Sequence, residues 1–381
     1  MGAKRMKVLL LTNTAGQGHN ATAKALCEYL ESVGAECRIL DSYRYISPAL
    51  YQTIARGYLI ATSITPVAYG TVYRFAENKE KNNSKYSMLN AANSIMSIKL
   101  ERFLRREFQP DVIICTHIFS AQLINAMKKN GRIRAKSVGI ITDFTIHPFW
   151  QDVEHIDYFV TASELLTRQA VRKGIDARKI LPFGIPIHPK FSAKLPKDEA
   201  RRMLGLAPDC FTVLVMGGSM GHGNLAGAIE QIDQLDNDFQ VLAVCGNNKH
   251  AYRKIRQMVT RQKVYTYGFV DNVDVMMDAA DCIITKPGGL TTSEALAKNL
   301  PILMMNPIPG QEERNVEFLV NNGLAVNVTN TYPVDEALYQ LFLYPQKLKN
   351  MEANIRLVGK PHATGDLCSF VMTLSQKSLP A

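Results

Sequence analysis

The stretch CIITKPGGLTTSEALAKNLPILMMNPIPGQEERN, residues 282–315, joins a short β-branched run to a glycine turn and a helical pattern. The run 282–285 leads into Lys286-Pro-Gly-Gly, and helical spacing begins at Leu290. Glycines let the backbone approach a ligand closely, and a helix N-terminus offers free N–H groups and positive dipole charge. We therefore expect a phosphate or pyrophosphate to bind where this strand meets its helix.

Further polar residues in the same stretch favour a nucleotide over an ordinary strand–helix connection. Glu294 lies about one turn inside the predicted helix, where a carboxylate can bind two neighbouring hydroxyls such as those of a ribose. Lys286 can add positive charge beside a phosphate. A second turn at Pro309-Gly-Gln311 follows, with Asn315 downstream.

The rest of the chain alternates strand and helix patterns, which is typical of α/β folds with parallel sheets. Helices are predicted between the strands, including residues 19–33, 84–107 and 119–130. The predicted strands are 7–12, 36–40, 111–115, 137–141 and 158–162, then 211–217, 239–246, 264–268, 282–285 and 301–305.

The strand pattern starts again after about residue 190, in a stretch rich in proline, FGIPIHPKFSAKLPKDEA. The length of 381 residues also suggests two domains. Two Rossmann-like halves joined by such a linker predict a cleft between them. Residues 43–110 break the rhythm and are rich in tyrosine, which leaves open a packed helical insertion or a lipid-facing element.

Positive charge is concentrated in the first half of the chain. Residues 1–190 hold 26 Lys and Arg against 15 Asp and Glu, whereas the second half is close to neutral. A one-sided basic surface suggests an anionic partner, either nucleic acid or an anionic membrane. No helix-turn-helix, RRM or zinc pattern supports nucleic acid, so no nucleic-acid partner is expected.

Several classes of protein are disfavoured. No uninterrupted apolar run reaches 18 residues, so no transmembrane helix is expected. The seven cysteines are odd in number and contain no C-x-x-C, which favours reduced thiols in the cytosol. The eight histidines show no metal-ligand spacing, so no metal is expected; Asp236-Asn-Asp238 lies away from the glycine loops.

The N-terminal loop GQGHNATAKAL, residues 16–26, begins as G-x-G-x-x-A, close to the dinucleotide fingerprint. Asp41 ends the next strand at the distance expected of a ribose-binding acid, so an NAD(P)-dependent oxidoreductase is an alternative. The nucleotide pattern of the second half argues against it. His19, directly after the second glycine, points instead to chemistry.

Residues 268–319 resemble the donor-sugar half of the GT-B glycosyltransferases of family 28. That family includes diacylglycerol glucosyltransferases, monogalactosyldiacylglycerol synthases and the lipid-linked N-acetylglucosaminyltransferase of peptidoglycan synthesis. The resemblance rests on G-F/Y-V at Gly268, K-P-G-G-x-T-x-x-E at 286–294 and P-x-P-G-Q-E-x-x-N at 307–315.

The resemblance implies two Rossmann-like domains facing across a cleft. Residues 1–190 would form the acceptor domain, with a membrane-facing insertion at about 43–110, and residues 191–360 the UDP-sugar domain. Residues 361–381 would return to the first domain as a helix.

The resemblance also assigns roles in binding the donor. Glu294 would hold the ribose, and Lys286 would add charge. The diphosphate would lie against Gly288, Gly289 and Thr291, and against Gly218 and Ser219 in the loop MGGSMGHGN; Gln311 and Glu312 would face the sugar, and Phe269 and Val270 the uracil.

On the acceptor side, the G-x-G-H stretch, Gly16 to His19, resembles the opening of the first helix in lipid-directed members of the family. The run ITDFTIHPFWQ, residues 141–151, resembles T-D-F-x-x-H-x-x-W and places Asp143, His147 and Trp150 on this side. Gly16 and Gly18 would lie beside them. His19 and Asp143 are both candidates for the catalytic base.

The implied reaction is transfer of a hexose, with inversion, from a UDP-hexose to the hydroxyl of diacylglycerol. Glucose is the expected sugar, with galactose left open. No cofactor is expected, and the enzyme would lie peripherally on the cytoplasmic side of the cell membrane, against an anionic surface. Alternatives are transfer to a polyprenyl-linked acceptor and a non-catalytic basic module.

Overall fold

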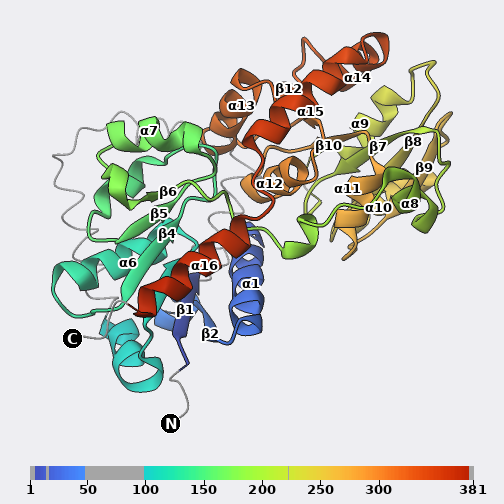
Figure 1. Ribbon diagram of the computed structural model, residues 1–381. Coiled ribbons are helices and arrows are strands. Elements are labelled where there is room, and N and C mark those ends of the chain that lie inside the picture. Colours follow the sequence, from blue (N-terminus) through green and yellow to red (C-terminus); the bar gives the residue numbers. More distant parts are fainter. Residues whose placement is uncertain (1–4, 14–16, 48–97, 222, 377–381) are drawn as a thin grey trace. The chain divides into compact units, whose positions relative to one another are not determined.

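The computed structural model describes residues 5–13, 17–47, 98–221 and 223–376 (Figure 1). Most of the expected insertion, residues 48–97, therefore lies outside the described residues. The chain divides into two compact units. Unit 1 comprises Met1–Pro189, Ile308–Gln311 and His362–Ala381, and unit 2 comprises Lys190–Pro307 and Glu312–Pro361. The first division falls within the proline-rich stretch.

Unit 1 contains a six-stranded parallel sheet in the order β2-β1-β3-β4-β5-β6. Its inner strands are buried at nearly every position, as expected of a parallel sheet that helices cover on both faces. The strands are β1 Lys7–Thr12, β2 Glu36–Asp41, β3 Val112–Cys115, β4 Lys136–Ile140, β5 Tyr158–Val160 and β6 Ile180–Leu181.

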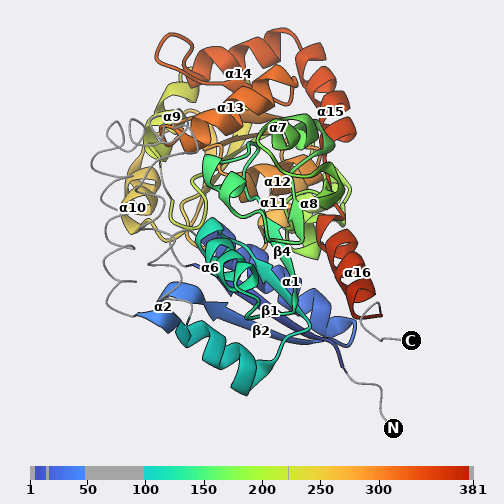
Figure 2. The ribbon, with the colours of Figure 1, turned by 90° about the vertical axis from the view of Figure 1, so that its left-hand side faces the viewer.

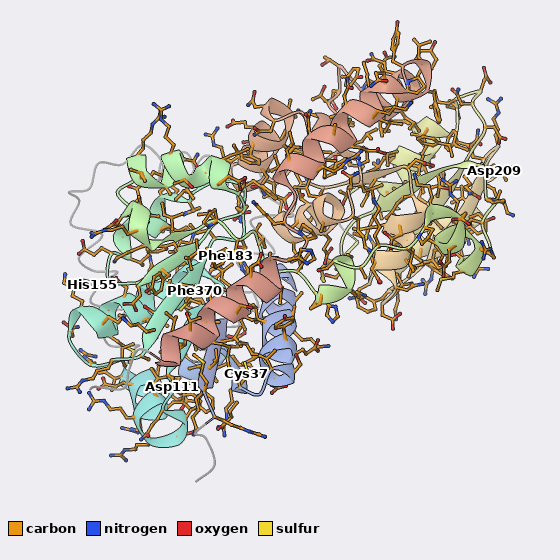
Figure 3. All side chains as sticks on the ribbon, viewed as in Figure 1. Cys37, Asp111, His155, Phe183, Asp209 and Phe370 are labelled. Atoms are coloured by element: carbon orange, nitrogen blue, oxygen red, sulfur yellow. The ribbon has the colours of Figure 1, made fainter. Side chains whose placement is uncertain are left out.

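Helices α1 and α16 cover one face of this sheet and lie side by side (Figures 1 and 2). Their apolar side chains share one core with alternate residues of β1, β3 and β4. Phe370 of α16 stacks edge to face on Tyr158 and Phe183 (Figure 3). The main helices of unit 1 are α1 Gln17–Ser32, α2 Ser42–Ile46, α6 Ile118–Lys129, α7 Thr167–Arg172 and α16 Ala363–Gln376, with a helical segment at 98–103 that continues as a π-helix, Leu104–Phe108.

Unit 2 repeats the architecture with a parallel sheet in the order β12-β11-β10-β7-β8-β9. Helices α9, α10, α14 and α15 contribute to the core on one face. The strands are β7 Phe211–Met216, β8 Phe239–Val244, β9 Lys263–Tyr267, β10 Cys282–Thr285, β11 Ile302–Met304 and β12 Ala325–Asn327. The helices are α8 Lys197–Met203, α9 Leu225–Ile232, α10 Lys249–Gln257, α11 Val273–Ala279, α12 Gly289–Ala297, α13 Gln311–Asn321, α14 Val334–Leu343 and α15 Gln346–Val358.

All ten predicted strands are present, and the expected α/β fold with two Rossmann-like units is confirmed. Sequence reasoning missed β6 and β12. These strands are two and three residues long.

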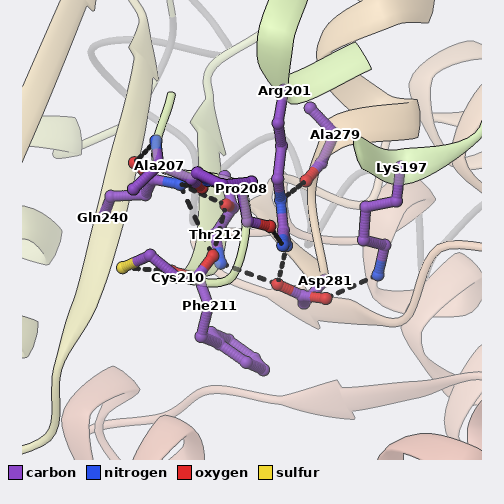
Figure 4. Close-up of polar contacts among 10 residues, drawn as sticks. All are labelled: Lys197, Arg201, Ala207, Pro208, Cys210, Phe211, Thr212, Gln240, Ala279 and Asp281. Atoms are coloured by element: carbon purple, nitrogen blue, oxygen red, sulfur yellow. Dashed lines mark hydrogen bonds and ion pairs between the residues drawn. The ribbon is translucent and has the colours of Figure 1, made fainter. Parts of the chain in front are cut away.

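A buried ionic network fixes the first helix of unit 2 to its sheet (Figure 4). Asp281 accepts hydrogen bonds from Lys197 and Arg201 of α8 and, at 2.7 Å, from the backbone N–H of Thr212. Arg201 is 6% exposed and also donates to the carbonyl oxygens of Ala279 and Pro208. Each of the three nitrogen atoms of this buried guanidinium therefore donates a hydrogen bond to an oxygen.

Candidate active site

The carboxyl ends of β1, β3 and β4 lie next to one another in the sheet of unit 1, because these strands pair in parallel and in register. Ligands bind at such edges in open α/β sheets. Three histidines gather there: His19 in the first turns of α1, His117 after β3 and His147 after β4.

His19 is half-buried, and its ring is held by the backbone. Its Nδ1 lies 2.7 Å from the carbonyl oxygen of Thr116, with the hydroxyl of Thr142 at 3.3 Å. A carbonyl oxygen only accepts, so Nδ1 carries the proton and Nε2 keeps its lone pair. Burial lowers the pKa of His19 to about 4, although the hydrogen bond to Thr116 acts in the opposite direction. His19 is thus a neutral base at physiological pH.

His117 was not singled out in the sequence, yet its ring packs edge to face on that of His19, with the centroids 4.6 Å apart. Its Nδ1 accepts a hydrogen bond from the N–H of Phe119 at 3.2 Å, which caps α6. Burial holds the pKa of His117 well below its ordinary range, and the nearby His19 and His147 lower it further.

His147 and Trp150, predicted on the acceptor side, have different surroundings. His147 caps the 3₁₀ helix Pro148–Asp152 by accepting from the N–H of Phe149 at 3.2 Å. Trp150 is 5% exposed and lies in the core, where it meets Gly139 of β4 and the ring of Phe159 edge to face. Packing accounts for the position of Trp150, and the acceptor-side roles of His147 and Trp150 stay predictions.

Asp143, the second candidate base, accepts a hydrogen bond of 2.8 Å from Nε2 of Gln311. Both residues belong to unit 1. Gln311, expected to face the sugar, thus contacts the other base candidate. Gly18 lies in the first turn of α1, and Gly16 lies outside the described residues.

In unit 2, the two halves of the K-P-G-G…P-G-Q-E-x-x-N pattern meet. Lys286 donates to Oε1 of Glu312 at 2.5 Å, and Nδ2 of the buried Asn315 donates to the carbonyl oxygen of Pro287. Glu312 and Asn315 lie three residues apart on one face of α13 and so hold the glycine turn. Lys286, expected at the phosphate, is ion-paired with Glu312, which was expected at the sugar.

The turn itself ends in a helix start with open backbone donors. Gly288 is the N-cap residue of α12 and has no side chain that could accept from the first N–H groups of the helix. Gly289 is the first residue of α12. A Cβ on Gly288 would lie 3.5 Å from Oε1 of Glu312 and 3.7 Å from Nζ of Lys286. Thr291 lies half-buried in the first turn of the same helix. This arrangement can receive an anion.

Glu294 lies within α12 and has an unusual environment. Burial raises its pKa to about 8; Lys190 lowers it and Asp274 raises it. Lys190 forms an ion pair of 3.1 Å with Asp274. Among the described residues, none forms a hydrogen bond or ion pair with the Glu294 carboxyl group. The carboxyl group is therefore available to a ligand such as a ribose diol.

The glycine loop after β7 is closed by its neighbours. Gly218 and Gly221 have positive φ angles of 68° and 63°. A Cβ on Gly221 would lie 2.1 Å from the carbonyl oxygen of Cys245, so only glycine fits. The carbonyl oxygen of Ser219 accepts from the N–H of Asn247 at 2.9 Å, which ties the turn to the end of β8.

Phe269 and Val270, expected at the uracil, follow β9. Phe269 is 65% exposed, as suits a residue that gains an apolar partner on ligand binding. Val270 is half-buried. Their roles stay predictions, as do those of Gly218, Ser219 and Thr291.

Two kinds of feature are absent from the described part of the chain. Its helices are all too short or too polar to cross a membrane. Its His, Cys, Asp and Glu side chains form no group of three that could hold a metal ion.

Comparison with known proteins places this geometry in a family. Residues 19–187 match the family model of monogalactosyldiacylglycerol (MGDG) synthase, and residues 212–365 match the C-terminal domain of glycosyltransferase family 28. A processive diacylglycerol beta-glucosyltransferase of Bacillus licheniformis is 30% identical over 92% of this chain and 90% of its own length. The chain belongs to the diacylglycerol glycosyltransferases of family 28.

Other members of this family are similarly related. The processive diacylglycerol beta-glucosyltransferase of Bacillus pumilus is 29% identical over 97% of this chain and 95% of its own. A probable chloroplastic monogalactosyldiacylglycerol synthase of Glycine max is 30% identical over 84% of this chain and 62% of its own.

Solved structures support the GT-B fold expected of a family 28 glycosyltransferase. MurG of Acinetobacter baumannii has a TM-score of 0.64 at 13% identity, covering 97% of this chain and 100% of its own. A UDP-GlcNAc 2-epimerase of Neisseria meningitidis has a TM-score of 0.59 at 13% identity and the same coverage. Since an epimerase shares the fold, the fold alone does not fix the reaction.

Proposed function

We propose that this protein transfers a hexose, with glucose as the first candidate, from a UDP-sugar to the hydroxyl of diacylglycerol. The observation that carries the proposal is His19, a neutral imidazole whose Nδ1 is engaged by Thr116 and whose Nε2 has no hydrogen-bond partner among the described residues. It lies in the half of the chain that matches the MGDG synthase family model.

In the proposed reaction, His19 Nε2 takes the proton of the acceptor hydroxyl as its oxygen attacks C1 of the sugar. The new C1–O bond forms while the bond from C1 to the UDP oxygen breaks on the opposite face, which inverts C1 to a β-linkage. Asp143 is the alternative base. It is the weaker candidate because its carboxylate already accepts a hydrogen bond from Gln311, which makes it less basic.

UDP leaves as an anion, and unit 2 supplies the groups that would stabilise it. The open N-terminus of α12 at Gly289 and the glycine turn at Gly218 provide backbone donors. Glu294 would accept hydrogen bonds from the ribose hydroxyls. Lys286 would stabilise the diphosphate while keeping Glu312 in place.

The test is a turnover assay of the full chain with UDP-glucose or UDP-galactose and diacylglycerol in mixed micelles, with the lipids resolved by chromatography. We expect a glycosylated diacylglycerol. A polyprenyl-linked acceptor is the matched alternative, and product formed only from it would refute the diacylglycerol assignment. Calorimetry with UDP and with NAD separates the transferase from an oxidoreductase.

Diacylglycerol resides in a bilayer, so we also propose peripheral binding to an anionic membrane surface on the cytoplasmic side. The support is the excess of 26 Lys and Arg over 15 Asp and Glu in residues 1–190. Each basic residue near an anionic leaflet contributes about 1 kcal/mol, screened by salt. The full chain should sediment with phosphatidylglycerol vesicles at low salt and be released at high salt. Equal sedimentation with neutral vesicles would refute the electrostatic account.

A further inference from the structure

His117 and His19 are held as opposite tautomers by backbone groups. The N–H of Phe119 donates to His117 Nδ1, so in the neutral ring the proton of His117 lies on Nε2. His19 carries its proton on Nδ1, which donates to the carbonyl oxygen of Thr116. Both constraints come from main-chain atoms at the end of β3, whose donor and acceptor roles are not interchangeable.

Asn13 adds a second constraint on His117. It is fully buried directly after β1, and its Nδ2 lies 3.2 Å from His117 Nδ1. Because Nδ1 already accepts from Phe119, the amide must present its NH₂ group there, and its Oδ1 has no hydrogen-bond partner in the part of the chain that the structure describes. A side chain that follows β1 and a main-chain N–H of α6 thus both hold Nδ1 of His117.

The position of His117 also keeps it uncharged. It caps α6, a helix of 12 residues whose positive N-terminal dipole disfavours an imidazolium. The two titratable groups whose charge acts on it, His19 and His147, disfavour its protonation further. A neutral neighbour matters because His19 must become positively charged when it takes a proton, and a charged ring at 4.6 Å would oppose that.

We propose that His117 is a positioning residue for His19: packed edge to face and fixed in the opposite tautomer, it keeps the His19 ring against the carbonyl oxygen of Thr116, so that Nε2 stays the basic atom. This inference rests on the proposed function, in which His19 takes the proton of the acceptor hydroxyl. His117 itself acts through His19.

The test uses H117N in the full chain. Asparagine is a favourable N-cap, so it can accept from Phe119 and keep α6 while removing the imidazole. H155N is the matched control, because His155 lies in the same unit at its surface, away from the strand ends that hold His19 (Figure 3). A thermal melt and near-ultraviolet circular dichroism check that H117N is folded in unit 1, and UDP affinity checks unit 2.

We expect H117N to lower kcat roughly 10- to 100-fold, the cost of a misplaced reacting group, with the KM for UDP-glucose changed less than about twofold. H155N should retain wild-type kcat. A kcat of H117N within about twofold of wild type would overturn the inference.

Nitrogen-15 NMR of the histidine side chains tests the same inference without turnover. In the wild type we expect His19 protonated on Nδ1 and His117 on Nε2, both neutral at pH 7, with assignments from H19Q and H117N. In H117N the pKa of His19 should rise from about 4 toward its ordinary value. The reverse tautomers in the wild type would refute the positioning role even if H117N proved unstable, and an unshifted His19 in folded H117N would refute it as well.

Wild-type turnover separates the inference from the proposed function. A wild type that glycosylates no lipid would refute the proposed function and leave the NMR test standing. An active wild type with an equally active H117N would refute the positioning role alone.

Discussion

UDP should bind this protein more tightly as the pH rises from 7 to 9, because Glu294 must lose a proton to accept both ribose hydroxyls. Its pKa of about 8 means that roughly one tenth of the free protein carries the carboxylate at pH 7 and nine tenths at pH 9. The apparent Kd scales inversely with the competent fraction, so it should fall about tenfold over this range.

Titration calorimetry of UDP at pH 7, 8 and 9 measures this change. The diphosphate of UDP is already ionised over this range, so the change in affinity reports on Glu294. At pH 7 binding should release close to one proton, which buffers of different ionisation enthalpy reveal. E294Q should bind with a Kd that does not vary with pH, because the amide does not titrate. K190M should move the midpoint above pH 8, since Lys190 lowers the Glu294 pKa.

A wild-type Kd constant within twofold from pH 7 to 9 would refute the ribose role of Glu294, as would an equal slope in E294Q. The sign for stability is opposite to that for binding. The folded protein holds this proton to a higher pH than the unfolded chain, whose glutamate has a pKa near 4.5. The contribution of Glu294 to folding is therefore complete at low pH and decreases as the pH rises toward 8.

Three further predictions concern His19, the Asp281–Arg201 ion pair and the contact between Gly139 and Trp150. H19Q should lower kcat on the order of 10²–10⁴-fold while leaving the Kd of UDP unchanged in calorimetry; full activity would exclude His19 as the base. D281A should lower the free energy of unfolding in urea by about 3–5 kcal/mol because it leaves Arg201 buried without its partner, and R201M/D281L should cost less. G139A should cost about 1–3 kcal/mol, since the new Cβ would lie 2.7 Å from the Trp150 ring, and a thermal melt should show partial recovery in G139A/W150F.

The predicted parts of the fold share a local cause. Strands such as β1 and β7 are buried on both faces, so their apolar runs stand out in the sequence. The turn at Gly288 was recognisable for a similar reason, because a strand, glycines and a helix start follow one another within a few residues.

What sequence reasoning missed depends on contacts between distant residues. The sequence did not show that the Trp150 ring is buried where Gly139 leaves room for it; the acceptor-side role of Trp150 stays a prediction. Lys286 and Glu312 belong to two separate motifs and lie 26 residues apart in the sequence, so their ion pair is a tertiary contact. His117 had a usable local signal: His-x-Phe occurs at 117–119 and again at 147–149, and in both places Nδ1 caps the following helix.

The last helix, α16, has a consequence for how this chain is made. Leu367, Cys368 and Val371 of α16 complete the same core as Val8 and Leu26, more than three hundred residues earlier. A ribosome must therefore release almost the whole chain before the core of unit 1 can be completed. Unit 2 can fold while α16 is still missing from that core. Loop closure over such a distance is slow. Synthesis that stops before residue 363 would leave an exposed apolar face on an otherwise finished sheet, a natural target for chaperones and proteases.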